Sequence, residues 1–301
     1  MLLALSNRPR IGAAMERLAF TRRFVRRFVA GREPDDALAV IGTLQAGGLA
    51  SAVTYLGENV RTAADAEHAT TTYLRLLDAI GGRGLRTTPS LKLTHLGLDL
   101  DEGLCVANLT KVAERARAVG TRLWIDMAGS RYTGRTLDLY ARLRPAHSHL
   151  GCVVQAYLRR TPDDVERLIE LGATVRLCKG AYHEPPDRAY PDKRDVDTSY
   201  ARLTERLLAA DALARGVYPG FATHDERLQG HVRRVAAERG IAADRFEIQM
   251  LYGIRHDLHP VLTSTGVSLR VLVPFGEDWY GYFMRRLAER PANFLFLLKQ
   301  I

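Results

Sequence analysis

The stretch GCVVQAYLRRTPDDVERLIELGATVRLCKG, residues 151–180, contains a complete strand–helix–strand pattern. Cys152–Tyr157 and Thr174–Cys178 are short apolar runs with β-branched residues, which is typical of strands buried on both faces. Between them, the segment 161–172 carries its apolar residues at helical spacing and predicts a helix. A strand, a helix and a second strand in this order indicate one parallel β/α unit.

The ends of this helix also carry recognisable signals. Thr161 is expected to be its N-terminal cap, with Pro162 in the first turn. Val165 and Ile169 lie four residues apart on the side that we expect to be buried, and Gly172 is expected to end the helix.

The same alternation runs through most of the chain. The expected strands are Ala50–Leu56, Ser90–Leu96, Arg122–Met127, Cys152–Tyr157, Thr174–Cys178, Gly220–Thr223, Phe246–Leu251 and Ser268–Val273. Repeated strand-then-helix units predict an α/β fold of the (β/α)8 barrel type, which needs about 250 residues. A doubly wound open sheet is the alternative, although no GxGxxG motif follows the first strand. The proline-rich stretch Tyr182–Asp197 is expected to be a functional loop.

Composition places the chain among ordinary globular proteins. It has 301 residues, of which 47% are hydrophobic and 26% charged, and this excludes disordered, collagenous and coiled-coil proteins. No apolar run approaches the roughly 20 residues of a membrane span, and residues 1–5 are too short for a signal-peptide core. Three cysteines without close spacing fit a reducing compartment, so we expect a cytoplasmic protein.

Positive charge is concentrated near the N-terminus. The net charge is +9, and residues 1–35 carry eight arginines against three acidic residues. Within them, residues 21–29 predict an amphipathic helix with Phe24 and Phe28 on one side. Two interpretations stay open: the apolar stripe packs on the main domain, or the basic arm contacts anionic lipid or nucleic acid. We expect residues 1–45 to form a basic helical arm and residues 46–301 to form the barrel.

Polar side chains recur where the expected strands end. They are Lys92, Asp126, Gln155, Arg176, Lys179, Thr223, His224, Glu247 and Gln249, followed by Arg285 and Arg286 after the last strand. Polar groups are costly in such apolar strands unless they meet a ligand or one another. Any one of them can be explained as a satisfied interior residue. Because active sites of parallel barrels lie at the carboxyl ends of the strands, the repetition predicts one shared site.

The residue types suggest which ligands this site binds. Arg285, Arg286 and Lys92 suit a carboxylate, the arginines as bidentate forks and the lysine as a point charge. Lys179 followed by Gly180 suits close approach of the backbone to a phosphate. The sequence therefore predicts a large anionic cofactor together with a small carboxylate.

We expect no metal site. His147 and His149 precede a strand and are expected to be solvated, and they have no partner ligands nearby in sequence. His256 and His259 share a helical face but lack a third ligand.

Several ordered motifs resemble those of a known family. They are Lys92-Leu-Thr, Ile125-Asp126-Met127, Gln155-Ala-Tyr157, Arg176-Leu-Cys-Lys179-Gly-Ala-Tyr182, Ala222-Thr-His-Asp225, Phe246-Glu-Ile-Gln249-Met-Leu-Tyr-Gly253 and Arg285-Arg-Leu-Ala-Glu289-Arg-Pro. From about residue 26 onwards, the chain resembles the monofunctional bacterial proline dehydrogenases, which are FAD-dependent enzymes with a distorted (β/α)8 barrel.

The resemblance implies a reaction and its partners. L-Proline, or a closely related cyclic or secondary amino acid, is oxidised to Δ1-pyrroline-5-carboxylate by hydride transfer from C5 to N5 of FAD. This is the first step of proline catabolism to glutamate, and a quinone accepts the electrons. A quinone acceptor implies a cytoplasmic protein that contacts the inner face of the membrane peripherally. Nucleic acid is not an expected partner, and the oligomeric state stays open.

The resemblance also implies roles for individual residues. Asp126 and Arg176 are the implied catalytic residues. The implied cofactor-binding residues are Met127, Gln155, Arg176, Lys179, Gly180, Ala181, Thr223, His224, Glu247 and Gln249. The implied substrate-binding residues are Lys92 and Leu272 together with Arg285, Arg286 and Glu289, the last three on a final helix at about 278–290. Glu58 is implied to pair with Arg285 as a gate over the substrate.

Three positions depart from the family pattern. Leu272 replaces a tyrosine, Ala128 a glutamate and Thr54 an aspartate that the family usually carries near the substrate. Loss of one hydrogen bond in a closed site costs roughly 1–3 kcal/mol, which reduces efficiency without abolishing it. The departures therefore suggest a less efficient proline oxidase, or an enzyme for hydroxyproline or pipecolate.

Two other classes of function remain as alternatives. A barrel aldolase would use Lys92 or Lys179 to form a Schiff base. A basic nucleic-acid-binding protein is less consistent with the sequence, because the excess charge is confined to the arm and lacks interleaved aromatic residues beyond Phe24 and Phe28.

Overall fold

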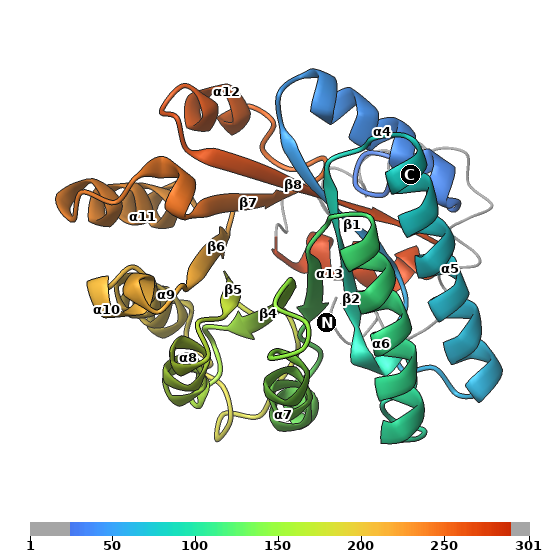
Figure 1. Ribbon diagram of the computed structural model, residues 1–301. Coiled ribbons are helices and arrows are strands. Elements are labelled where there is room, and N and C mark those ends of the chain that lie inside the picture. The colour runs from blue at the N-terminus through green and yellow to red at the C-terminus, as the bar shows by residue number, and fades with distance from the viewer. Residues whose placement is uncertain (1–24, 290–301) are drawn as a thin grey trace.

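Eight parallel strands close into a barrel in the computed structural model, which describes residues 25–289 (Figure 1). The strands are β1 Ala50–Tyr55, β2 Thr87–Lys92, β3 Leu123–Asp126, β4 Leu150–Gln155, β5 Thr174–Cys178, β6 Tyr218–Ala222, β7 Glu247–Leu251 and β8 Ser268–Phe275. Each strand pairs with the next along the chain, and β8 pairs with β1. The expected (β/α)8 fold is confirmed. The open sheet is excluded, because an open sheet would leave two edge strands unpaired.

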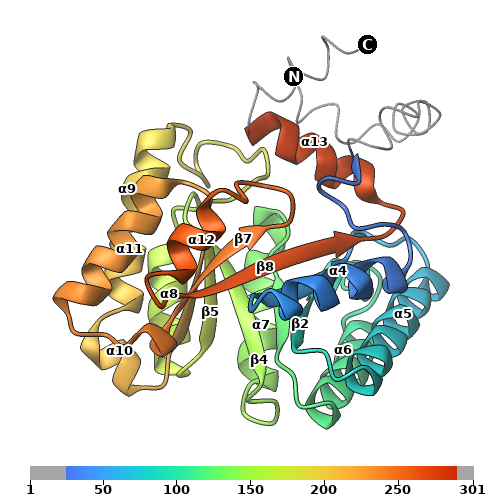
Figure 2. The same ribbon diagram turned by 90° about the horizontal axis from the view of Figure 1, so that it is seen from above.

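Helices connect the strands and surround the barrel (Figure 1). They are α4 Pro34–Ala46, α5 Ala63–Gly82, α6 Glu102–Ala118, α7 Thr133–Leu143, α8 Thr161–Glu170, α9 Lys193–Leu207, α10 Ala210–Ala214, α11 Glu226–Glu238, α12 Leu258–Thr263 and α13 Trp279–Glu289. Helix α4 packs outside β1 and β8 through buried Ala37, Leu38 and Ile41. Figure 2 shows α13 lying across the end of the barrel towards which the strands run.

Helix α8 follows its sequence pattern closely except at its start. Val165 is buried, and Gly172, with a φ of 56°, lies just beyond the last turn as predicted. Thr161 was expected to be the cap, and this is wrong, because it is the first helical residue. Its hydroxyl donates to the carbonyl oxygen of Gln155 at 2.5 Å. The connection from β4 is so short that this side chain ties the helix to the end of the strand.

Strand β2 begins and ends earlier than its apolar run suggests. The sequence predicts a strand over 90–96, whereas β2 ends at Lys92 and residues 93–95 form a 3-10 turn. This turn is apolar because it packs beneath α6, where Asn108 Nδ2 donates to the carbonyl oxygen of Leu96 at 3.2 Å. Hydrophobicity reports burial here and does not distinguish a strand from a buried turn.

The irregular stretch after β5 is shorter than predicted. The sequence suggests a loop over 182–197, but α9 already begins at Lys193. Asp192 caps this helix by accepting a hydrogen bond from the backbone N–H of Arg194 at 2.7 Å. The charged residues that suggested a loop are compatible with a helix, because a helix can turn a charged face to solvent.

The interior of the barrel contains charged side chains that bond to one another. Arg270 of β8 pairs with Glu247 of β7, with Nε 2.8 Å from Oε1. Gln249 donates to Glu247 and accepts from Arg176 of β5. A connected hydrogen-bond network therefore crosses the barrel and satisfies groups that would be costly to bury alone.

The described part of the N-terminal segment packs on the barrel. Phe28 and Val29 are buried in one cluster with Trp279 and Phe283 of α13. This agrees with the interpretation in which the apolar stripe covers the main domain, while residues 1–24 lie outside the described part of the chain. Among residues 25–289, no helix combines the length and apolar character needed to cross a membrane.

Two glycines allow the packing of the barrel interior to be tested. A Cβ on Gly151 of β4 would lie 2.6 Å from the Trp124 ring, whereas a Cβ on Gly230 of α11 would meet nothing within 4 Å. We expect Gly151→Ala to lower the free energy of unfolding by about 1–3 kcal/mol through overpacking. Gly230→Ala should raise it by about 0.5–1 kcal/mol. Urea denaturation checks both, and equal effects of the two variants would contradict this account of the interior.

Candidate active site

Arg176 occupies the centre of the predicted site. Its guanidinium is 5% exposed, and Nη1 donates to Asp126 Oδ1 at 2.6 Å and to Ser90 Oγ at 3.0 Å. Nε donates to Gln249, and the guanidinium carbon lies 4.4 Å from the ring centroid of Trp124. Contacts from three other strands, β2, β3 and β7, hold the group in one orientation, which is the arrangement that a preorganised site requires.

One nitrogen of the Arg176 guanidinium remains available to bind an acceptor. Burial lowers the pKa of Arg176, and Asp126 opposes this effect, so the group remains a paired cation. Its Nη2 is buried and has no hydrogen-bond partner among the described residues. An unsatisfied donor on a buried guanidinium is costly unless a ligand accepts from it. The geometry therefore suits an acceptor atom beside Arg176.

A second cation lies at the end of β2. Lys92 pairs with Glu58, with Nζ 2.8 Å from Oε2, and the Tyr182 hydroxyl donates to the same oxygen at 3.0 Å. Burial and the neighbouring charge of Lys92 lower the pKa of His95 to about 4, so His95 is neutral at physiological pH. A Cβ on Gly57 would lie 2.3 Å from this imidazole. The loop after β1 thus rests directly on His95 and places Glu58 over Lys92.

A third cation lies at the end of β5. Lys179 Nζ is 2.6 Å from Asp197 Oδ1 and 3.1 Å from Asp225 Oδ2. The next residue, Gly180, has a φ of 109°, and a Cβ there would lie 2.2 Å from the Tyr157 ring. Only glycine fits this position, because the Tyr157 ring occupies the space that a side chain would need. Burial alone would raise the pKa of Asp225, but Lys179 outweighs it and lowers the pKa to about 2.

Other predicted cofactor-binding residues line the same strand ends. Gln155 is buried and donates through Nε2 to the carbonyl oxygen of Ala128 at 3.0 Å. Thr223 Oγ1 accepts from the backbone N–H of Asp225 at 3.2 Å, and His224 Nε2 accepts from the backbone of Leu251 at 2.8 Å. Met127 is buried and Ala181 is half-buried in this region. These bonds fix the loops that follow β3 and β6 to the ends of β4 and β7.

Glu247 does not lie where the sequence suggested. It is the first residue of β7, and its carboxylate pairs with Arg270 and accepts from the Tyr218 hydroxyl at 3.2 Å. It therefore lies at the amino-terminal side of the barrel and reaches the site only through Gln249. Arg270 was missed by the sequence reasoning. A charged residue in the otherwise apolar run 268–275 was the signal that could have found it.

Several predicted substrate-binding residues are described only in part. Arg285, Arg286 and Glu289 belong to α13 by their backbone, but their side chains lie outside the described part of the structure. The predicted pairing of Arg285 with Glu58 also involves a side chain outside the described part of the structure. Leu272 is half-buried on β8, in register with Ala52 of β1.

The carboxylates that hold Lys179 were also missed by the sequence reasoning. Asp197 lies inside the stretch that was interpreted as a loop, and Asp225 was quoted only within a motif. Conversely, His147 was expected to be solvated, and this is wrong, because it is buried with its ring 5.9 Å from that of His149.

A family model described as proline dehydrogenase matches residues 37–298. The chain belongs to the proline dehydrogenase family. Proline dehydrogenase 2 of Bacillus subtilis (strain 168) is 39% identical over 273 residues, covering 91% of this chain and 88% of the relative. Proline dehydrogenase of Deinococcus radiodurans is 36% identical over 305 residues, covering 99% and 96%. These relatives have nearly the same length as this member of the proline dehydrogenase family.

Solved structures support the fold of this proline dehydrogenase family member. Proline utilization A (PutA) from Bdellovibrio bacteriovorus superposes with a TM-score of 0.82 at 24% identity. The superposition covers 89% of this chain and 32% of that chain, so this chain spans about a third of the larger protein. At this identity the likeness concerns the fold alone.

The Lys179–Asp225 pair predicts a specific dependence of stability on pH. The folded pKa of Asp225 lies below the unfolded value of about 3.9, so its stabilising contribution is complete above pH 4 and disappears as the pH falls towards 2. We expect Asp225→Asn to lower the free energy of unfolding by about 1 kcal/mol at pH 7, after discounting for solvent screening.

Asparagine caps a helix as well as aspartate does, so Asp225→Asn removes the charge and retains the N-terminal cap of α11. The difference from wild type should shrink between pH 4 and pH 2 in denaturation curves. Asp187→Asn, at an exposed carboxylate without an ion pair among the described residues, is the control and should change little. A pH-independent effect of Asp225→Asn would contradict the assignment.

Proposed function

We propose that this protein oxidises L-proline to Δ1-pyrroline-5-carboxylate with FAD as its cofactor. Forming the C5–N double bond removes a hydride equivalent from C5 and a proton from the nitrogen. The observation that carries the proposal is Arg176, a buried cation with one unsatisfied donor, held by Asp126 at the carboxyl end of a barrel that belongs to the proline dehydrogenase family. The sequence relatives named as proline dehydrogenases support the substrate.

The residues at the strand ends fit FAD. Arg176 Nη2 supplies a donor that lacks a partner among the described residues, and Gly180 allows a cofactor to approach the backbone. Lys179 supplies positive charge for the phosphates, and Gln155 and Gln249 supply amides beside Arg176. FAD, when bound, supplies the acceptor for the two electrons removed from the substrate. We propose Met127, Ala181, Thr223 and His224 as further contacts of the cofactor.

The substrate carboxylate is proposed to bind Lys92 together with Arg285 and Arg286 of α13. Lys92 is well placed because it ends β2, in register with Asp126. Glu58 already lies 2.8 Å from Lys92 and is proposed to close over the substrate with Arg285. Glu289 is proposed to line the same pocket.

Each turnover requires an electron acceptor, and we propose a membrane quinone. The supporting observation is the excess of arginine in residues 1–35, which suits contact with anionic lipid at the inner face of the membrane. In this proposal residues 1–45 are the basic arm and residues 46–301 the catalytic barrel, and the lipid contact is assigned to the arginines that precede α4, because α4 itself packs on β1 and β8.

The absorption spectrum of the purified protein tests the proposed function. After incubation with FAD, the protein should show a flavin spectrum, and anaerobic addition of L-proline should bleach it. Lys92→Gln should bind FAD normally but need roughly tenfold more proline for half-maximal bleaching, because about 1.4 kcal/mol of carboxylate binding is lost. Lys111→Gln, at an exposed position on α6, is the matched control. A protein that stays colourless with FAD would refute the cofactor.

Oxidation of a different cyclic amino acid is a second candidate function, and the apolar residues around Leu272 favour it. This half-buried apolar side chain lies in register with Ala52 and Leu251, so its two cross-strand neighbours also lack a hydroxyl. An apolar wall favours an added methylene, as in pipecolate, over an added hydroxyl, as in 4-hydroxyproline, by about 1–3 kcal/mol.

A comparison of kcat/KM for proline, 4-hydroxyproline and pipecolate tests this candidate. Pipecolate should be used at least tenfold better than 4-hydroxyproline, and Leu272→Tyr should move the preference towards proline. Equal use of the two analogues by the wild-type protein would remove the candidate and leave proline oxidation untouched.

A further inference from the structure

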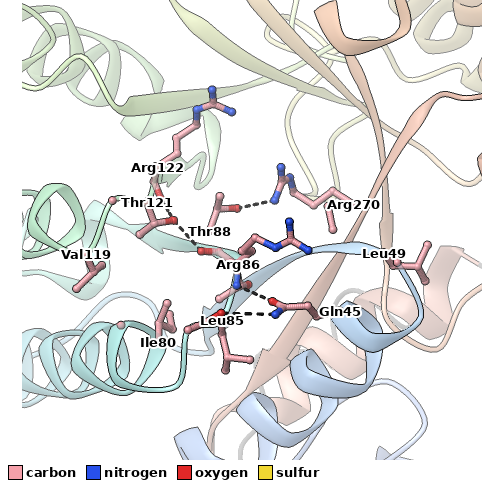
Figure 3. A pocket seen from close by; sticks show the side chains of 16 residues that line it. Gln45, Leu49, Ile80, Leu85, Arg86, Thr88, Val119, Thr121, Arg122 and Arg270 are labelled. Atoms are coloured by element: carbon pink, nitrogen blue, oxygen red, sulfur yellow. Dashed lines mark hydrogen bonds between the residues drawn. The ribbon is translucent and has the colours of Figure 1, made fainter.

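We propose that the amino-terminal mouth of the barrel binds a small dianion between Arg86 and Arg122. The ligand class is a small molecule that carries a phosphate or two carboxylates. This site lies at the opposite end of the barrel from the proposed active site, because it is built from the residues that begin the strands. Figure 3 shows the side chains that line the opening, among them those of Arg86, Arg122 and Arg270.

The opening is a pocket of about 690 Å³. Its walls are the loops that lead from α4 into β1, from α5 into β2 and from α6 into β3, together with the start of β8. Small-molecule sites usually have volumes of about 300–1,000 Å³. The pocket is therefore large enough for a phosphate ester or a dicarboxylate of several carbon atoms.

The three loops share one backbone design. Each contains a glycine with positive φ, namely Gly48 at 76°, Gly84 at 61° and Gly120 at 72°. After each glycine the chain turns back and its N–H bonds a carbonyl of the preceding helix, as for Leu49 to Leu44, Leu85 to Ile80 and Thr121 to Ala116. These helix-end carbonyls are already hydrogen-bonded, which weakens the negative charge that they present to the pocket.

Two cations in the pocket form no salt bridge, although Glu247 lies near enough to Arg122 to raise its pKa against the effect of burial. The Arg122 guanidinium lies 4.8 Å from the Tyr218 ring centroid, and burial lowers its pKa without removing its charge. Arg86 is exposed, and its backbone N–H donates to Gln45 Oε1 at 2.7 Å. Within residues 25–289, no carboxylate lies within 4.0 Å of either guanidinium. Arg122 in particular is a desolvated charge that an anion would stabilise.

Arg270 is different because its charge is already compensated. Its Nε and Nη2 contact the two carboxylate oxygens of Glu247 at 2.8 Å and 2.9 Å, and Nη1 donates to the carbonyl oxygen of Ser51 at 2.7 Å. Arg270 and Glu247 therefore form an ion pair with no net charge beside the pocket. The net charge that faces the pocket from the arginines and Glu247 is +2, which matches a dianion.

The pocket also contains an unused hydroxyl. Thr87 lines it, and Thr87 Oγ1 is buried without a hydrogen-bond partner among the described residues. A guanidinium fork binds phosphate or carboxylate through two parallel hydrogen bonds, and the Thr87 hydroxyl lies buried in the wall beside it. The net charge of the pocket, its hydrogen-bond donors and its volume therefore all fit a small dianion.

Calorimetric titration of the FAD-saturated protein tests this site. Prior saturation with FAD occupies Lys179, whereas anion binding at the proposed substrate cation Lys92 is recognised because Arg86→Gln and Arg122→Gln should leave it unchanged. Inorganic phosphate and glutarate are the two dianion probes and separate the phosphate source from the dicarboxylate source. Acetate is the monoanion control. We expect one site per chain and at least tenfold tighter binding of one dianion than of acetate.

Two variants and a control locate the binding. Arg86→Gln changes an exposed side chain and should weaken dianion binding at least tenfold without affecting the fold. Arg122→Gln should do the same or more. Arg83→Gln, in the same loop but paired with Asp35, should bind as the wild type does.

The outcomes are distinguishable from those of the proposed function. Bleaching by proline should be unchanged in Arg86→Gln, because this residue is remote from the strand ends. Absence of dianion binding, or binding that Arg86→Gln and Arg122→Gln leave unchanged, would overturn the proposal. The arginines would then serve only to offset the carbonyl ends of the surrounding helices.

Discussion

The buried guanidinium of Arg176 is the constraint on which the rest of the barrel interior depends. Removing a charge of this size from water costs several kcal/mol unless partners surround it. Asp126 supplies the direct counter-charge, Ser90 accepts a further hydrogen bond, and Trp124 lies against the guanidinium. Gln249 accepts a hydrogen bond from Nε and connects Arg176 to Glu247. Substituting Asp126, Ser90 or Gln249 would leave another buried polar group unsatisfied.

This constraint explains why the polar groups extend through the barrel. Burial alone would raise the pKa of Glu247, but Arg270 outweighs that effect and keeps the carboxylate ionised. Arg270 in turn donates to the carbonyl oxygen of Ser51. The network therefore joins the carboxyl ends of the strands to their amino ends, and it holds Arg176 rigid without help from a ligand. A rigid cation is useful for catalysis, because no reorganisation is needed when charge develops.

The two ends of the barrel treat their cations differently. At the carboxyl ends, Lys92 pairs with Glu58, and Lys179 pairs with Asp197 and Asp225. A ligand anion there shares its cation with a carboxylate, which moderates binding and permits release. At the amino ends, Arg86 and Arg122 have no such partners among the described residues. The physical difference is that one end is preorganised around internal ion pairs, whereas the other has an uncompensated positive charge.

The sequence by itself determined the fold class and most members of the site. Strand-then-helix periodicity predicts the barrel. Polar residues such as Asp126 and Arg176 stand out in the apolar strands, because burying a polar group is costly unless it has partners. The tertiary structure decided which groups meet. Alternation along a strand shows that Glu247 and Gln249 share a face, but only the barrel register shows that Glu247 lies on the amino-terminal side with Arg270. Spacing along the chain carries no information about neighbours that the closed sheet brings together from opposite walls.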